Sequence, residues 1–394
     1  MSAPDAVARR LGAEVLGPLL GAMAGWVQER ARERGVDRLY FLGRDGWLFH
    51  RAMETLGLPA EPPGKDLLSS RRCWGLAAVR AFDQDGYRWF GTGLQRRAVR
   101  EWFERCDIVY DPEACRPGEV EPDTVFDLSD PVQNDRFRAV VFAHAPAIEA
   151  RARKERAALL AYLRAEGVDA PGTVGLVDVG WRGTAQVNLA SILQWPPERI
   201  VGFYWGVHRA DPQFEGLWYA GVQPGADLRT RPAAVFLMDC LFARPEPTLL
   251  RFELDEGGQA VPVTVHPEAD VAIHAAMAPA QAAALAWLRD AGIGGWRERA
   301  AAASRGLAAL LDRPCRAEVR FLRSLPYRQG QGADAALEPL AAAPAGWRAF
   351  LPSAWRRPFH EARWPEGLAA MAPAPLRWWL RRRIRRNRRL EEAG

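Results

Sequence analysis

Two stretches of the chain place an aspartate beside glycines and an arginine. Residues 43–46 read Gly-Arg-Asp-Gly, and residues 178–184 read Asp-Val-Gly-Trp-Arg-Gly-Thr. Free backbone N–H groups in glycine loops bind phosphate oxygens, and a carboxylate beside them can accept a proton or hold Mg²⁺. Asp45 and Asp178 are therefore the candidate catalytic residues of a predicted phosphate site.

A buried strand is expected before each of these loops and a helix after it. Residues 38–42 and 174–177 have the apolar, β-branched or aromatic composition of strands. Helical patterns follow over 47–56 and from Thr184, which is predicted near an N-cap. Loops at the carboxyl ends of parallel strands share one edge of a sheet, where ligands bind. The alternative is an ordinary strand-to-helix turn with a capping Thr and a salt-bridged Arg-Asp pair.

A third motif, Ser69-Ser-Arg-Arg72, is predicted to end a short strand over residues 67–72. Arg71 and Arg72 would then project near the same edge, where paired guanidinium groups suit bidentate binding of phosphate. Arginine is also the usual cation of this chain, because only two of its 53 Lys and Arg residues are lysines. Each arginine is therefore a candidate only where its position supports the role.

The whole chain is long enough for one large or two moderate domains, with 394 residues of which 48% are hydrophobic. Alternating strand and helix patterns predict an α/β fold with an open, mostly parallel sheet and flanking helices, plus a β-hairpin and a helical C-terminal region. We expect an α/β catalytic core over 1–245, a hairpin and Ala-rich helices over 246–345, and a Trp-, Pro- and Arg-rich tail over 346–394.

Composition favours a cytoplasmic protein. The chain has no run of 18 apolar residues and no charged-then-apolar N-terminal signal pattern. Its five cysteines are odd in number and widely spread, without metal-ligand spacing, so we expect reduced thiols in the core.

The C-terminal segment is strongly basic. Residues 377–389 hold eight arginines and no acid, and Trp378 and Trp379 are adjacent. A helix of this composition is typical of peripheral binding to an anionic membrane surface, such as the inner face of the plasma membrane. A disordered tail that binds nucleic acid is the competing interpretation and is not favoured.

A separate motif, Phe82-Asp-Gln-Asp-Gly86, has the outline of the haloacid-dehalogenase phosphatases, in which the first aspartate attacks phosphate. That chemistry needs a buried strand directly before the nucleophile, and residues 79–82 supply a poor one. A downstream Gly-Asp-x-x-x-Asp metal motif is also absent from the sequence. Asp83 and Asp85 therefore define only an alternative function.

The three loop motifs, in their order and spacing, resemble the C-terminal half of a bacterial family labelled as predicted haloacid-dehalogenase-type hydrolases of polysaccharide clusters. Those proteins are similar to dual-domain ribofuranosyltransferases, with an N-terminal phosphatase domain and a glycan phosphoribosyltransferase domain. Residues 236–242 and 364–367 also look family-like, so the resemblance spans about residues 12–370. By this resemblance we expect the sequence to correspond to the transferase part, without the phosphatase half.

The resemblance implies transfer of 5-phosphoribose from phosphoribosyl pyrophosphate to a glycan hydroxyl in surface-polysaccharide synthesis, with a separate phosphatase acting later. It agrees with the residues, since pyrophosphate departure needs cations and the acceptor needs a base. Either aspartate could act as the base or bind Mg²⁺. We assign Asp45 as the base and Asp178 as the residue that contacts the ribose or the metal. The candidate substrate- and phosphate-binding residues are Arg44, Gly46, Ser70, Arg71, Arg72, Gly180, Trp181, Arg182, Gly183, Thr184 and Gln186.

Two other functions remain open from the sequence. One is a sugar-phosphate phosphatase that uses Asp83 and Asp85. The other is a non-catalytic, membrane-docked protein that binds a glycan or nucleotide through the same loops. Trp181 in particular is as well suited to the core as to an acceptor site.

Overall fold

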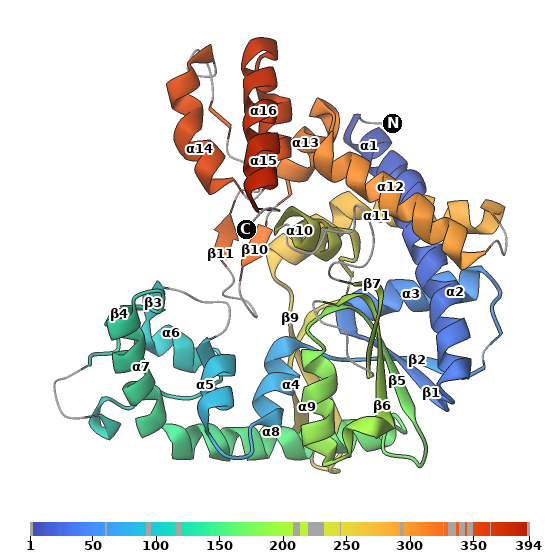
Figure 1. Cartoon of the computed structure of the whole chain (residues 1–394). Helices are drawn as coiled ribbons and strands as arrows, with labels where there is room; N and C mark the ends of the chain where they lie inside the picture. The colour runs from blue at the N-terminus through green and yellow to red at the C-terminus, as the bar shows by residue number, and fades with distance from the viewer. Residues whose placement is uncertain are drawn as a thin grey trace.

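The computed structural model describes residues 3–59, 61–91, 96–115, 120–207, 213–219, 232–244, 246–291, 295–325, 327–329, 336–338, 343–344, 350–362 and 364–391. Its centre is a five-stranded, all-parallel sheet with the order β2-β1-β5-β6-β7, which confirms the predicted fold class (Figure 1). The strands are β1 Arg38–Leu42, β2 Gly64–Leu67, β5 Val174–Trp181, β6 Ile200–Val207 and β7 Phe214–Tyr219.

Both faces of the sheet are covered, because successive side chains of a strand point to opposite sides. Leu39 and Phe41 of β1 enter one core, and Tyr40 and Leu42 enter another. The helices of the first core include α2 Gly17–Glu33, α3 Gly43–Thr55, α10 Pro232–Leu241, α11 Glu268–Ala291 and α12 Trp296–Asp312. Those of the second are α4 Arg71–Ala78, α8 Ala145–Ala165 and α9 Thr184–Leu193.

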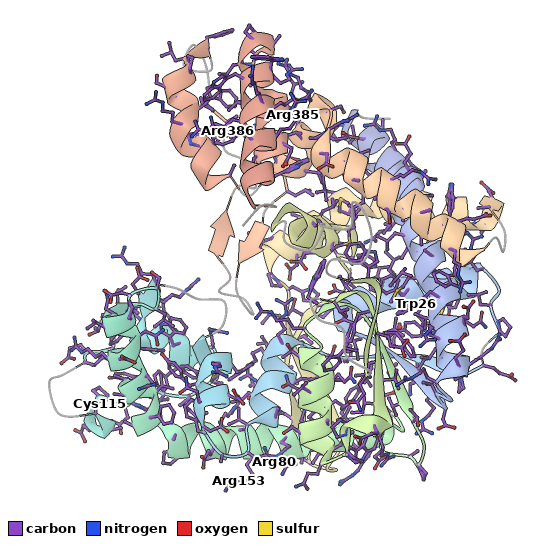
Figure 2. All side chains as sticks on the ribbon, viewed as in Figure 1. Trp26, Arg80, Cys115, Arg153, Arg385 and Arg386 are labelled. Atoms are coloured by element: carbon purple, nitrogen blue, oxygen red, sulfur yellow. The ribbon has the colours of Figure 1, made fainter. Side chains whose placement is uncertain are left out.

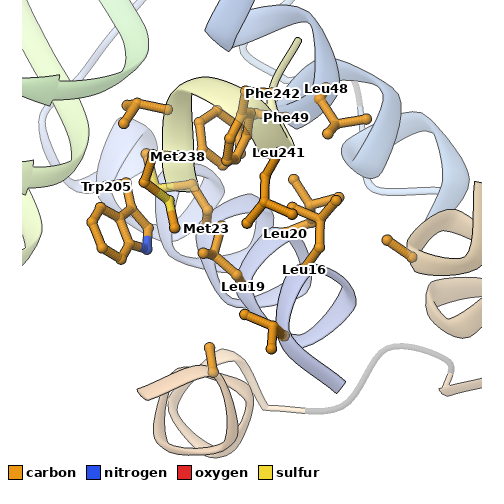
Figure 3. Close-up of a cluster of buried hydrophobic side chains, with 14 of the residues drawn as sticks. Leu16, Leu19, Leu20, Met23, Leu48, Phe49, Trp205, Met238, Leu241 and Phe242 are labelled. Atoms are coloured by element: carbon orange, nitrogen blue, oxygen red, sulfur yellow. The ribbon is translucent and has the colours of Figure 1, made fainter. Parts of the chain in front are cut away.

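The first core joins segments that are far apart in the sequence. Trp26 of α2, which is labelled in Figure 2, packs edge-on against Phe203 of β6, with ring centroids 5.9 Å apart. Phe49 of α3 contacts Phe242, just after α10, at 4.8 Å between centroids. Figure 3 shows Phe49 and Phe242 in one cluster with Trp205 of β6 and with Leu19 and Met23 of α2. This packing fixes α3, which begins directly after β1, against the sheet.

A separate hydrophobic cluster lies in the segment between β2 and β5. Its aromatic side chains include Phe90, Trp102, Phe126 and Phe137, all buried. The short elements of this segment are α5 Gln84–Gly91, β3 Arg96–Ala98, α6 Val99–Glu104, η2 Pro112–Ala114, β4 Val125–Asp127 and α7 Pro131–Ala143. Strands β3 and β4 pair antiparallel, and the long α8 carries the chain back to the main sheet (Figure 1).

The predicted hairpin and the helical C-terminal region are both present. Strands β8 Thr248–Leu254 and β9 Ala260–Val265 pair antiparallel, with Gly258 at φ +75° in the turn. Trp364 precedes α15 and donates a hydrogen bond from Nε1 to the carbonyl of Leu311, 2.9 Å away. The remaining elements are α1 Ala3–Leu11, η1 Gly12–Leu16, η3 Pro197–Arg199, α13 Arg316–Arg323, β10 Tyr327–Gln329, β11 Ala336–Glu338, η7 Pro352–Trp355, α14 Arg356–Glu361, α15 Pro365–Met371 and α16 Ala374–Glu391.

Among the described residues, one helix is long and apolar enough by composition to cross a membrane. This helix, α11, passes that test by length and hydropathy alone. It also contains Pro279 and buries Gln281, whose side-chain amide donates to the carbonyls of Leu241 and Ala243. A single such helix is weak support for a membrane span.

The five cysteines are free thiols, but they are not all in the core as the sequence predicted. Cys73, Cys106 and Cys240 are buried, Cys115 is half-buried and Cys315 is exposed. Cys315 is the N-cap of α13, and its Sγ accepts from the backbone N–H of Glu318. Cys315 is exposed because it caps a helix, and cysteine is not a residue whose spacing in the sequence predicts a cap.

These environments predict selective alkylation. Burial raises the pKa of Cys73 to about 12 and that of Cys106 to about 11, so neither forms a reactive thiolate near neutral pH. Iodoacetamide is expected to modify Cys315 in the folded protein and to modify Cys73 and Cys106 only in urea. Peptide mass mapping measures this, and rapid native labelling of Cys73 would contradict the buried placement of α4.

Candidate functional site

The three loop motifs meet at the carboxyl edge of neighbouring strands. From β1 the chain passes to β2 on one side and later to β5 on the other, so the order of strands reverses between β1 and β5. Such a reversal is the point where open α/β sheets bind ligands. We call residues 43–46, 69–71 and 178–184, which follow or end β1, β2 and β5, the switch-point loops. Two of them are partly regular: residues 43–46, predicted as a loop before a helix over 47–56, form the first turn of α3, and residues 178–181 end β5.

Two close backbone approaches hold these loops together. A Cβ on Gly43, where φ is +46°, would lie 2.7 Å from the carbonyl oxygen of Ser69. A Cβ on Gly46 would lie 2.5 Å from the carbonyl carbon of Phe41 and 2.9 Å from the carbonyl oxygen of Val177. Glycine is therefore required at both positions, and the role of Gly46 is close packing of the loop against β1 and β5.

Asp45 and Asp178 lie in two neighbouring elements, α3 and β5. Asp45 is half-buried in the first turn of α3, and Asp178 is half-buried within β5. The predicted end of this strand at Val177 is wrong, since β5 pairs with β6 through Trp181 and places Asp178 opposite Tyr204. Because Gly46 contacts Val177, the segments that carry the two aspartates belong to one corner of the sheet.

Three helices begin at this edge: α3 at Gly43, α4 at Arg71 and α9 at Thr184. Their N-terminal N–H groups and dipoles make the edge attractive to anions. No described side chain caps the N-terminus of α3 or α9. Ser70 does cap α4, because its Oγ accepts from the backbone N–H of Cys73 at 3.0 Å.

The chain bends sharply at the end of β5 and again just before α9. Gly180 has φ +104°, Trp181 has φ +90° and Gly183 has φ +64°. A Cβ on Gly180 would lie 2.6 Å from the carbonyl oxygen of Gly206. A positive φ at tryptophan is rare and strained, and such strain persists only where the surrounding structure imposes it. Gly183 is the N-cap of α9 and Thr184 is its first residue, so Thr184 lies next to the N-cap, as predicted.

Arg72 does not take the position predicted for a phosphate clamp. The strand β2 ends at Leu67, and residues 71–78 are helical. Arg71 and Arg72 therefore project from a helix in two different directions and do not form a pair at a strand end. Arg71 is exposed at the first turn of α4. Arg72 is buried, forms an ion pair with Glu155 and donates to the carbonyls of Arg105 and Leu250. Its guanidinium is committed to the protein interior.

Gln186 and Trp181 are also held by the fold. Gln186 is buried, donates to the carbonyls of Ile200 and Gln213, and accepts from the hydroxyl of Tyr204 at 3.0 Å. Trp181 is buried with its ring edge-on to Trp205, at 5.4 Å between centroids. We predicted that these two side chains contact substrate. Both are instead packed against other protein groups, so their roles are structural.

Burial and the charge of Asp178 raise the pKa of Tyr204 well above that of a free phenol. Tyr204 therefore stays protonated and keeps donating its hydrogen bond to Gln186. The bond links β6 to the first turns of α9, so it stabilises the loop that follows Asp178.

The exposed cations of the site are Arg71 and Arg182, and Thr184 is exposed beside them in sequence. The side chain of Arg44 lies outside the described residues. A further arginine, Arg244, reaches the edge from the segment after α10 and donates from Nη1 to the carbonyl of Gly43 at 3.2 Å. Nothing in the local sequence marks Arg244, because its contact spans about two hundred residues.

The alternative phosphatase motif has no strand before it. Asp83 precedes α5 and its Oδ1 accepts from the N–H groups of Asp85 and Gly86, as a helix cap does. Asp85 is exposed and paired with Arg88. The aspartates therefore lie at a surface helix terminus rather than at a strand end.

Within the described ranges, no group of three or more His, Cys, Asp or Glu side chains is placed to hold a metal ion. Mg²⁺ in phosphate-transfer sites is often held by one or two carboxylates together with substrate phosphates. Two half-buried aspartates at one sheet edge fit that donor set.

No protein-family model matches the chain, and a search of curated proteins finds no match. The structural class of the protein therefore rests on its fold and its candidate site alone. The chain is an open, parallel α/β protein with a candidate anion site at the reversal of its strand order.

Proposed function

We propose that the protein is a glycosyltransferase that moves 5-phosphoribose from phosphoribosyl pyrophosphate to a glycan hydroxyl. The observation that supports it most is the meeting of two aspartate-bearing loops and three helix N-termini at one sheet edge. A diphosphate needs several anion-binding groups, and the transfer needs a carboxylate beside them.

In the proposed reaction the bond from ribose C1 to pyrophosphate breaks, and pyrophosphate leaves with the electron pair. The glycan hydroxyl oxygen bonds to C1, and its proton passes to the carboxylate of Asp45. The N–H groups that begin α3 and α9 hold the phosphates, with Arg71 and Arg182 as charge partners. Asp178 orients the ribose hydroxyls or a bound Mg²⁺, and Mg²⁺ would supply charge against the leaving pyrophosphate.

Since the 5-phosphate stays on the product, we propose that a separate phosphatase removes it. This chemistry fits surface-polysaccharide synthesis on the cytoplasmic side of a bacterial membrane. A phosphatase acting through Asp83 and Asp85 is not favoured, because these residues cap and flank a surface helix.

The test is a transfer assay with purified protein, phosphoribosyl pyrophosphate, Mg²⁺ and a panel of bacterial glycans. Acceptor-dependent release of pyrophosphate, with a mass increase of one phosphoribosyl group on the glycan, is expected. Binding of phosphoribosyl pyrophosphate without turnover of any acceptor would instead favour the non-catalytic alternative. Phosphate release from ribose 5-phosphate that is lost in Asp83→Asn would favour the phosphatase.

A further inference from the structure

The C-terminal helix α16 uses its apolar side within the protein. Leu376, Leu380 and Ile384 recur every four residues and are buried. They pack in one cluster with residues of η7, α14 and α15, among them Trp355 and Phe359. The helix is thus anchored as part of a small folded unit, and its aliphatic stripe is not free to enter a membrane.

The opposite side of α16 carries a different set of residues. At 100° per residue, positions 378, 382 and 385 lie opposite the buried stripe, with 379, 381 and 386 on either side. Trp378 is 59% exposed and Trp379 is 39% exposed. The arginines at 381, 382, 385 and 386 are exposed as well, and Figure 2 shows Arg385 and Arg386 on α16, far from the main sheet. We call these six residues the Trp/Arg face.

The positive charge of this face is not neutralised within the described structure. No acidic residue occurs between Glu366 and Glu391. No described carboxylate pairs with the four arginines of the face. The guanidinium of Arg382 lies over the ring of Trp378, 5.4 Å from its centroid, so the cations and the aromatic rings form one continuous surface.

We propose that the Trp/Arg face docks the protein on an anionic lipid surface. Tryptophan rings are favoured at the level of the lipid headgroups, and each arginine near an anionic leaflet adds attraction. Single-stranded nucleic acid is usually bound in a positively charged groove that follows the backbone, whereas the side of one helix is convex. An amphipathic helix usually binds a membrane through its apolar face, whereas α16 would bind through its polar, Trp/Arg face. This binding is independent of the proposed transferase reaction.

The experiment is flotation of the full-length protein with vesicles of phosphatidylcholine alone or of phosphatidylcholine and phosphatidylglycerol in equal parts. Binding is expected only to the anionic vesicles, and it should weaken with added salt. Two variants remove the two parts of the face: one has Arg381, Arg382, Arg385 and Arg386 changed to Gln, and the other is W378A/W379A. A matched control removes four exposed arginines elsewhere, namely Arg9, Arg153, Arg305 and Arg320, each changed to Gln.

The face variant without arginines is expected to bind on the order of 100-fold more weakly, and W378A/W379A about tenfold more weakly. The control loses the same net charge as the face variant, and it should still bind within a few-fold of the wild type. Equal loss in the control and face variants would overturn the proposal, as would tighter binding to single-stranded DNA than to anionic vesicles. All substituted residues are exposed, and unchanged thermal unfolding verifies that the variants fold. Flotation does not depend on turnover, so a failed transfer assay leaves this result unaffected.

Discussion

Replacement of Asp45 or Asp178 with asparagine is expected to reduce phosphoribosyl transfer by about 10²–10⁴-fold and to leave the fold intact. Asparagine keeps the size and polarity of aspartate but neither accepts the proton of the acceptor hydroxyl nor carries charge to a metal. Both side chains are half-buried at the sheet edge, so the substitution leaves the apolar cores untouched.

The two variants should also differ from each other. If Asp178 holds Mg²⁺, Asp178→Asn should require a higher Mg²⁺ concentration for its residual rate, whereas Asp45→Asn should not. Steady-state kinetics over a Mg²⁺ series measures this, with circular dichroism to verify folding. Asp85→Asn is the matched control, because Asp85 is an exposed aspartate in a surface ion pair and should keep full activity. Wild-type rates in both site variants would rule out the proposed mechanism.

The sequence predicted the sheet and the meeting of its loops better than it predicted individual side chains. The apolar run over 38–42 coincides with β1, since a fully buried parallel strand needs a continuous apolar sequence. The sequence predicts an end of β5 that is too early, because Asp178 and Gly180 are typical strand terminators. Pairing with β6 carries the strand through both residues, and no local pattern records that partner.

The errors at Arg72 and Gln186 have a common physical cause. Each was assigned from neighbours in sequence, but its environment is set by residues far along the chain. Glu155 lies 83 positions after Arg72, and the carbonyl of Gln213 lies 27 positions after Gln186. Arg244 was missed for the same reason. Backbone-determined features such as the glycines of the loops were more predictable, because glycine itself reports close approach or a positive φ.

Glu155→Gln is expected to destabilise the protein by about 3–5 kcal/mol, because it leaves a buried guanidinium without its counter-charge. The side chain of Arg72 is 6% exposed and that of Glu155 is 2% exposed. Burial by itself would lower the pKa of Arg72, but the hydrogen bond and charge of Glu155 outweigh it and raise the pKa. Glu155 also pairs with Arg151, but Arg151 keeps a second ion pair with Asp107, so Arg72 is the cation that loses its counter-charge.

The ion pair joins α4 to α8, and Arg72 extends the link to the carbonyl of Leu250 in β8. Urea unfolding should therefore show a lower midpoint with little change of slope. Asp85→Asn breaks an exposed ion pair and should cost about 0–1 kcal/mol, which controls for loss of charge alone. A double variant, Arg72→Met with Glu155→Leu, is expected to recover part of the loss, since no charge then remains to be buried. A loss below about 1 kcal/mol in Glu155→Gln would contradict the burial of Arg72. In that case the guanidinium would reach solvent, and the phosphate-binding role that its burial excludes would be open to it again.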